Sequence, residues 1–157
     1  MMRYTITQSR ILYVLSINDR THKDLLKIGE VFVDNEVADQ PSRQALAKAV
    51  REVLDARPYM KGVNYHIEHV ECTTYEQNTK CYKVDDVYRT LRAMGIPSKS
   101  LNTYKDPVMG RNEEADIWFD VSLWDIQHAI QLIKEGKGAG YGAIKFRPEQ
   151  EDRKSVV

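Results

Sequence analysis

The chain has 157 residues, 42% of them hydrophobic and 29% charged, and this balance argues against an intrinsically disordered protein. Its 23 lysines and arginines equal its 23 aspartates and glutamates, and this zero net charge argues against a protein that coats nucleic acid through bulk positive charge. No apolar run has membrane-spanning length and no signal peptide is recognisable, so we expect a cytoplasmic protein without a membrane partner. Cys72 and Cys81 form no C-x-x-C pair, and we expect them to be reduced thiols.

Two apolar segments near the start of the chain, residues 11–17 and 25–33, have the composition of β-strands. The polar stretch between them favours a turn, and the pair is predicted to form an antiparallel hairpin. Lys27 and Gly29 lie inside the second segment, where a glycine weakens a strand and a lysine needs water or a partner for its ammonium group. These two residues mark the hairpin as the first candidate for a functional site.

The rest of the chain continues as short strands and amphipathic helices. The predicted elements are a helix capped by Ser42 and ended by Pro58, a strand over 64–75, a helix over 84–94 ended by Gly95, a strand over 116–121, and a helix capped by Ser122 and ended by Gly136. Residues 98–114 show no periodicity and are predicted to be a loop. We expect a small mixed α+β domain over residues 1–135, with the hairpin and a third strand forming a central antiparallel sheet flanked by helices.

Three short motifs in this order resemble a known nuclease family. The strand triads Ile11-Leu12-Tyr13 and Lys27-Ile28-Gly29, followed by the segment "DIWFDVSLWDIQHAI" at 116–130, are similar to the GIY-YIG nuclease superfamily, in particular its phage-derived K-I-G branch. The resemblance covers about residues 10–135. Three positions depart from the family pattern: the first triad lacks its glycine, the second has lysine in place of tyrosine, and Ile117 replaces a glutamate.

The C-terminal part of the chain carries a second resemblance. Residues 136–142, "GKGAGYG", have the composition of a flexible linker. The segment "FRPEQ" at 146–150 then resembles the R-P-x-Q segment with which superfamily 2 helicases contact the adenine of ATP. This implies that residues 136–157 are a linker and the start of a DEAD/DEAH-type helicase motor, in a helicase or restriction-type protein of the same full-length chain.

The nuclease resemblance implies a metal-dependent DNA endonuclease that hydrolyses phosphodiester bonds with Mg²⁺ or Mn²⁺. Tyr13 would then activate or position the attacking water, Lys27 would supply positive charge to the phosphate, and Gly29 would allow a close approach of backbone or substrate. Two structural alternatives stay open. Tyr13 can be a core aromatic residue, and Lys27 can extend to water at an edge strand.

The resemblance also implies a catalytic arginine on the first long helix. Arg51 in the middle of that helix is the preferred candidate, because Arg43 and Arg57 lie in its first and last turns, where helix ends fray. The alternative is a solvated arginine without a catalytic role.

The third strand carries the pattern "HIEHVE" from His66 to Glu71. Such a mixture of imidazole and carboxylate groups can bind metal or transfer protons, and His69 is the candidate catalytic residue. The alternative is a solvated face with cross-strand charge pairs. Strand alternation places His66 and Glu68 on one face and His69 and Glu71 on the other, unless a bulge intervenes.

The metal-binding carboxylate that the resemblance implies belongs on the second long helix. Val84 occupies that glutamate position and Tyr88 occupies the position of the accompanying histidine, which makes Tyr88 a candidate substrate-binding residue. Asp85 and Asp86 are the candidate metal ligands, and the alternative is that they stabilise the N-terminus of the helix. Without a carboxylate at the site, the domain would be a catalytically degenerate module that binds DNA or a protein partner and targets the helicase.

Overall fold

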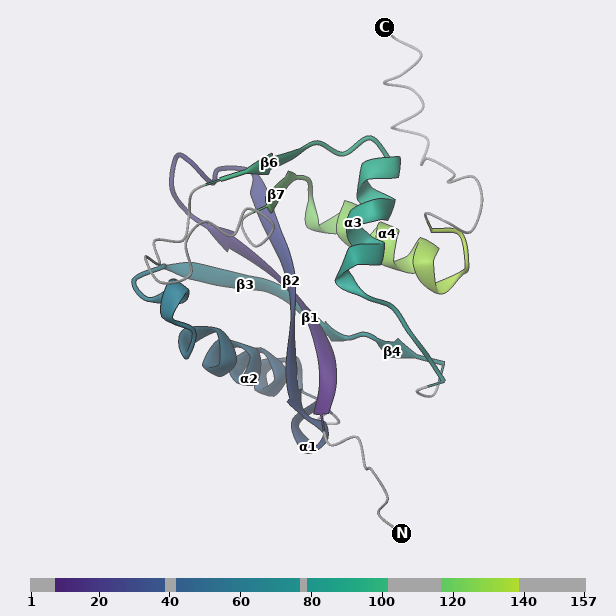
Figure 1. Ribbon diagram of the computed structural model, residues 1–157, viewed down its shortest axis with the longest axis horizontal. Coiled ribbons are helices and arrows are strands. Elements are labelled where there is room, and N and C mark those ends of the chain that lie inside the picture. The colour runs from purple at the N-terminus through teal and green to yellow at the C-terminus, as the bar shows by residue number, and fades with distance from the viewer. Residues whose placement is uncertain (1–7, 39–41, 77–78, 102–116, 139–157) are drawn as a thin grey trace, which may run out of the picture.

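A computed structural model of the chain describes residues 8–38, 42–76, 79–101 and 117–138 (Figure 1). The helicase-like segment at 146–150 and most of the expected linker lie outside the described residues. The expected loop at 98–114 is described only as far as residue 101.

A five-stranded antiparallel sheet forms the middle of the domain, in the strand order β3-β1-β2-β7-β6. Its strands are β1 (Gln8–Ile17), β2 (Leu25–Asp34), β3 (Tyr65–Cys72), β6 (Ser98–Ser100) and β7 (Ile117–Asp120). The β1–β2 hairpin with β3 alongside confirms the predicted α+β domain and its central sheet.

Three longer helices cover the two faces of this sheet (Figure 1). α2 (Arg43–Asp55) lies on one face, and α3 (Val84–Ala93) and α4 (Leu123–Lys134) lie together on the other. The shorter elements are α1 (Asn35–Ala38), a 3-10 turn (Pro58–Met60), and the two-residue strands β4 (Thr74–Tyr75) and β5 (Lys80–Cys81). The expectation of a loop was wrong for residues 98–100, which form β6. These residues are held in a strand by hydrogen bonds to β7, and their sequence has no periodicity that predicts this pairing.

Alternate residues of β1 supply the two hydrophobic cores. Leu12 and Val14 face α3 and α4, and Ile11, Tyr13 and Leu15 face α2. All five side chains are buried, which is the pattern of a central strand covered on both faces.

The two predicted serine caps are confirmed. The Ser42 Oγ accepts a hydrogen bond from the Ala45 backbone N–H at 3.3 Å, and the Ser122 Oγ accepts one from the Asp125 N–H at 3.2 Å. Each satisfies one of the backbone donors that the first helical turn leaves without a partner.

A bulge interrupts the pairing of β1 with β3. Val14 is opposite His69, but the next residue, Leu15, is opposite Ile67. Glu68 is therefore an extra residue of β3 that has no pairing partner in β1. This is the bulge that the sequence left open as the exception to simple alternation.

Candidate functional site

Gly29 makes room for the side chain of Tyr13 on the neighbouring strand. The two residues are opposite each other in the β1–β2 ladder. A Cβ atom built on Gly29 would collide with the phenol of Tyr13, and even the ring atom Cε2 would lie at only 2.7 Å. The sequence predicts a close approach of backbone or substrate at Gly29, and in the structure the side chain of Tyr13 occupies that space.

Tyr88 reaches the edge of β2 from α3. In the described part of the chain, β7 pairs with β2 only at Leu25 and Leu26. Farther along β2, the Tyr88 hydroxyl donates to the backbone carbonyl of Ile28 at 2.5 Å and accepts a hydrogen bond from the Lys27 Nζ at 3.2 Å. A side chain of α3 therefore contacts the strand where β7 no longer does.

Tyr13, Lys27, Gly29 and Tyr88 together form what we term the hairpin cluster. Tyr13 is 5% exposed and Lys27 is 4% exposed, so the cluster is largely desolvated. Burial raises the pKa of Tyr88 above its usual value, the neighbouring Tyr13 adds to this shift, and the charge of Arg92 opposes it. The Tyr88 phenol therefore stays protonated at neutral pH, where it serves as a hydrogen-bond donor beside a cation.

A surface group adjoins the hairpin cluster and was missed by the sequence analysis. Glu30 follows Gly29 directly, and its carboxylate lies 3.3 Å from the Arg10 Nε. The Arg10 guanidinium lies 5.5 Å from the ring centre of Phe32, which is opposite Arg10 in the ladder. Phe32 was detectable as the one aromatic residue in the second strand segment, but the sequence does not reveal that its side chain is half exposed.

Arg51 contacts Tyr65, which lies close enough to Tyr13 of the hairpin cluster to interact with it electrostatically. Its guanidinium stacks over the ring of Tyr65 at 4.7 Å, and the Tyr65 hydroxyl donates to the Asp55 carboxylate at 2.7 Å. Burial and the Asp55 carboxylate raise the pKa of Tyr65, while the charge of Arg51 opposes this shift. Of the other two helix arginines weighed from the sequence, Arg43 lies 3.5 Å from the His69 Nδ1.

His69 belongs to a partly buried polar network at the other edge of the sheet. The His69 Nε2 lies 2.8 Å from one oxygen of Glu71, while the other oxygen accepts from the Tyr82 hydroxyl at 2.7 Å and the Lys134 Nζ at 3.2 Å. Burial alone would raise the pKa of Glu71, but the hydrogen bonds from His69 and Tyr82 and the charge of Lys134 lower it to about 2. β1 separates β3 from β2, so this network is distinct from the hairpin cluster.

The bulge decides which face the third-strand residues share. His66 and His69 are opposite Ser16 and Val14, which lie on the same side of β1, so both histidines face α3 and α4. The prediction that a regular strand would place them on opposite faces does not apply here, because Glu68 is the extra residue between them.

The candidate metal ligands have other partners. The Asp86 carboxylate accepts from the backbone N–H of Lys83 at 2.9 Å and pairs with Arg89, and Asp85, 73% exposed, lies 3.4 Å from the same Arg89. Val84, at the position where the resemblance expects a glutamate, is buried. Within the described ranges, no group of three histidine, cysteine or acidic side chains is arranged to hold a metal ion. These residues therefore do not fit Mg²⁺ or Mn²⁺.

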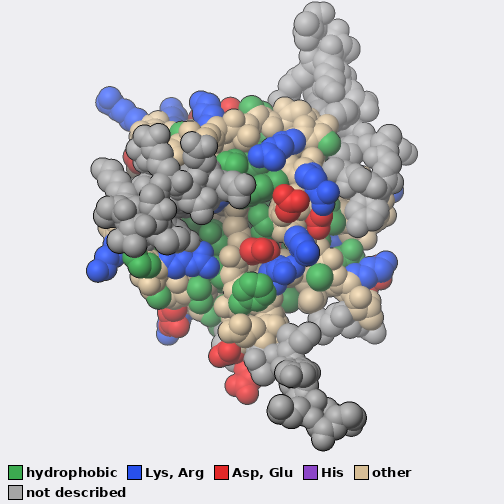
Figure 2. Space-filling model, in the orientation of Figure 1, with side chains coloured by type: hydrophobic (Ala, Val, Ile, Leu, Met, Phe, Trp, Pro, Cys, Tyr) green, Lys and Arg blue, Asp and Glu red, His purple; other side chains and the backbone are tan. Residues whose placement is uncertain are grey.

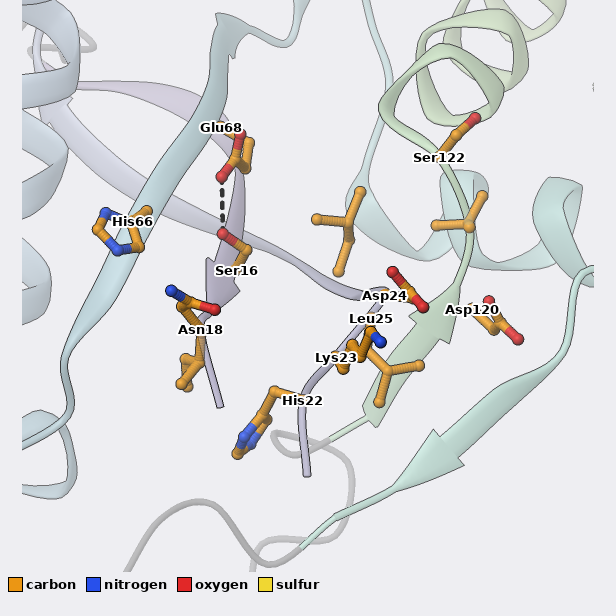
Figure 3. A pocket seen from close by; sticks show the side chains of 13 residues that line it. Ser16, Asn18, His22, Lys23, Asp24, Leu25, His66, Glu68, Asp120 and Ser122 are labelled. Carbon is orange, nitrogen blue, oxygen red and sulfur yellow. Dashed lines mark hydrogen bonds between the residues drawn. The ribbon is translucent and has the colours of Figure 1, made fainter. Parts of the chain in front are cut away.

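An open cavity of about 660 Å³ lies beyond the hairpin cluster, where β1 ends and β2 begins (Figure 3). Ser16 and Glu68 line one side, where the Ser16 hydroxyl donates to the Glu68 carboxylate at 2.6 Å, and Asp24 and Asp120 line the other. None of the hairpin-cluster residues lines this cavity. Its acidic walls do not favour a phosphate ligand.

Comparison with known proteins gives no independent assignment. No family model, curated protein or solved structure matches this chain significantly. Across the described residues, the helices are all too short or too polar to cross a membrane.

Proposed function

We propose that the domain binds DNA, as a GIY-YIG-like module that contacts a backbone phosphate at the hairpin cluster. The observation that carries this proposal is the meeting of Tyr13, Lys27 and Tyr88 beside Gly29, since the resemblance names all four positions and Lys27 and Tyr88 are 61 residues apart. The resemblance of residues 146–150 extends the proposal to a DNA-contacting domain that targets a helicase motor in the same chain.

The chemistry of the cluster suits an anionic oxygen. The Lys27 ammonium is a charged hydrogen-bond donor, and such a donor forms a stronger bond to a charged phosphate than to a neutral acceptor, whereas the Tyr88 proton is donated to the Ile28 carbonyl. Arg92, an exposed arginine of α3, lies 5.9 Å from the centre of the Tyr88 ring and supplies positive charge beside the cluster.

Binding without cleavage is the activity that these side chains support by themselves. Hydrolysis in the family requires a carboxylate-held metal ion, and here Asp86 bonds to a helix N-terminus while Val84 replaces the expected glutamate. Metal-dependent cleavage is the second candidate. It is favoured by one observation, the position of the Tyr13 and Tyr88 phenols next to Lys27.

A binding titration with a matched control tests the proposal. The variant Lys27→Met keeps the length of the side chain and removes its charge, and Lys48→Met does the same on an exposed lysine of α2, across the sheet. We expect Lys27→Met to weaken binding of fluorescein-labelled DNA about tenfold, since one charge-assisted bond is lost, and Lys48→Met to bind as the parent does. Equal affinities for all three proteins would contradict the proposal.

A plasmid nicking assay separates the two candidates. We expect no nicking by the parent protein with Mg²⁺ or Mn²⁺. If the parent nicks the plasmid and the Tyr13→Phe variant does not, the function is metal-dependent cleavage rather than binding alone.

A further inference from the structure

We infer that Phe32 and Arg10 form a stacking site for an unpaired base beside the hairpin cluster, so that the preferred ligand is single-stranded or locally unpaired DNA. This inference rests on the proposed function, because it specifies the kind of DNA that the site accepts. It adds a second contact, to a base, beside the contact to a phosphate.

The first argument is the exposure of Phe32. Its neighbours Val31 and Val33 are buried under α2, whereas Phe32 points to the other face and is 50% exposed. Within the described residues, Trp124 is the one comparably exposed large hydrophobic side chain, and its ring already stacks on His128 at 5.0 Å. An aromatic ring that remains half exposed on a sheet face is the kind of surface on which nucleic-acid-binding sheets stack bases.

The second argument is the position of Arg10. It lies opposite Phe32 in the ladder and over the Phe32 ring, and its ion pair with Glu30 holds the guanidinium in place. A guanidinium beside an aromatic ring provides a planar stacking partner and a cation that attracts the nucleic-acid backbone. Base stacking and backbone attraction are thus available at one pair of residues.

The third argument is spacing. Phe32 lies three positions after Gly29 in β2, about 10 Å along the strand, and its side chain is on the sheet face from which Tyr88 reaches the hairpin cluster. A phosphate at the hairpin cluster and a base on Phe32 would therefore belong to nearby nucleotides of one strand. In a duplex both faces of each base are covered by its neighbours, so a base reaches Phe32 only where the strand is unstacked.

The face that carries Phe32 has charged side chains of both signs. Figure 2 shows Lys and Arg side chains interspersed with fewer Asp and Glu side chains in the middle of the face where Figure 1 places α3 and β2. The charged side chains of β1, β2 and α3 are four cations, Arg10, Lys27, Arg89 and Arg92, and four anions, Glu30, Asp34, Asp85 and Asp86. These charges balance, as they do in the whole chain.

Two variants of Phe32 test the inference. Phe32→Tyr keeps an aromatic ring and Phe32→Leu removes it, and Trp124→Leu removes a comparably exposed aromatic residue from α4 as the control. With a labelled oligo(dT), we expect Phe32→Leu to bind about tenfold more weakly than the parent, and Phe32→Tyr and Trp124→Leu to bind as the parent does. With a blunt duplex of the same length, Phe32→Leu should bind as tightly as the parent.

The failures of the inference and of the proposed function are distinguishable. If Lys27→Met weakens binding but Phe32→Leu binds oligo(dT) as the parent does, the stacking site is wrong and the phosphate contact stands. If the parent prefers the duplex, the inference is likewise overturned. If the parent binds neither DNA, the proposed function fails. Far-UV circular dichroism and thermal melting of each variant establish that a loss of binding is not a loss of fold.

Discussion

The absence of a side chain at Gly29 allows Tyr13 to lie across the neighbouring strand. Tyr13 occupies the space where a side chain of β2 would otherwise stand. Tyr13 also lies close enough to Tyr88, the hydrogen-bond partner of Lys27, to interact with it electrostatically. One glycine thus connects the hairpin to α3.

At this residue scale we predict that Gly29→Ala lowers the free energy of unfolding by about 1–3 kcal/mol, the usual cost of overpacking a well-filled site. The added methyl group would collide with the Tyr13 phenol, so the ring has to move. Urea unfolding of Gly29→Ala, Tyr13→Ala and the double variant measures the coupling between the two positions. If Gly29→Ala lowers the free energy of unfolding as much in the Tyr13→Ala background as in the parent, the collision with the Tyr13 ring is not the cause of the destabilisation.

At the scale of one helix, two adjacent aspartates of α3 have different roles. Asp86 bonds to the backbone N–H of Lys83 and pairs with Arg89, whereas Asp85 is an exposed partner of the same arginine. We predict that Asp86→Ala lowers the free energy of unfolding by about 1 kcal/mol, because a helix-capping bond is lost. Asp85→Ala should leave thermal unfolding unchanged. A larger effect at Asp85 than at Asp86 would contradict this assignment.

At the scale of one strand, the Glu71 network of β3 predicts a pH dependence of stability. The hydrogen bonds from His69 and Tyr82 lower the pKa of Glu71 from 4.5 to about 2 in the folded protein, despite the opposing effect of burial. The unfolded chain therefore takes up this proton first as the pH falls, and stability is lost between about pH 5 and pH 2. The shift corresponds to about 3 kcal/mol at neutral pH.

The variant Glu71→Gln tests this pH dependence. It should be less stable than the parent at pH 7, and its free energy of unfolding should fall less steeply between pH 5 and pH 2. Parallel curves for the two proteins in acid denaturation, followed by circular dichroism, would show that Glu71 does not carry the dependence.

At the scale of the whole molecule, the sheet separates two hydrophobic cores, one under α2 and one under α3 and α4. The hairpin cluster lies where these two halves meet at the edge of β2, since Tyr13 approaches from the α2 side and Tyr88 from the α3 side. The geometry of the cluster therefore depends on the packing of both halves.

The proposed function also predicts the response of the whole domain to metal. Because the described residues contain no arrangement of three metal-binding side chains, we expect millimolar Mg²⁺ or Mn²⁺ to leave the melting temperature unchanged. Differential scanning fluorimetry of the parent and of Asp86→Ala measures this. A rise in melting temperature that saturates with metal concentration and is absent from Asp86→Ala would instead assign the metal to α3.

Local signals predicted most of the fold, because caps, alternation and turn residues act over a few positions. Ser42, Ser122 and the β1–β2 hairpin are examples that the structure confirms. The site was predictable only in part. The family motif pointed to Tyr13, Lys27, Gly29 and Tyr88, which meet, but long-range packing directs Arg51 to Tyr65 and brings Lys134 to the carboxylate of Glu71. No local pattern encodes such contacts between distant segments.

The extra residue in β3 also bears on which changes of length the domain tolerates. Without Glu68, Ile67 and His69 would become consecutive partners of Leu15 and Val14, and every other side chain of β3 would keep its present face. Losing a residue inside the strand but outside this bulge would instead turn part of the strand over and bring buried side chains to the surface. Position 68 is therefore where this strand can shorten by one residue during evolution without rebuilding either core.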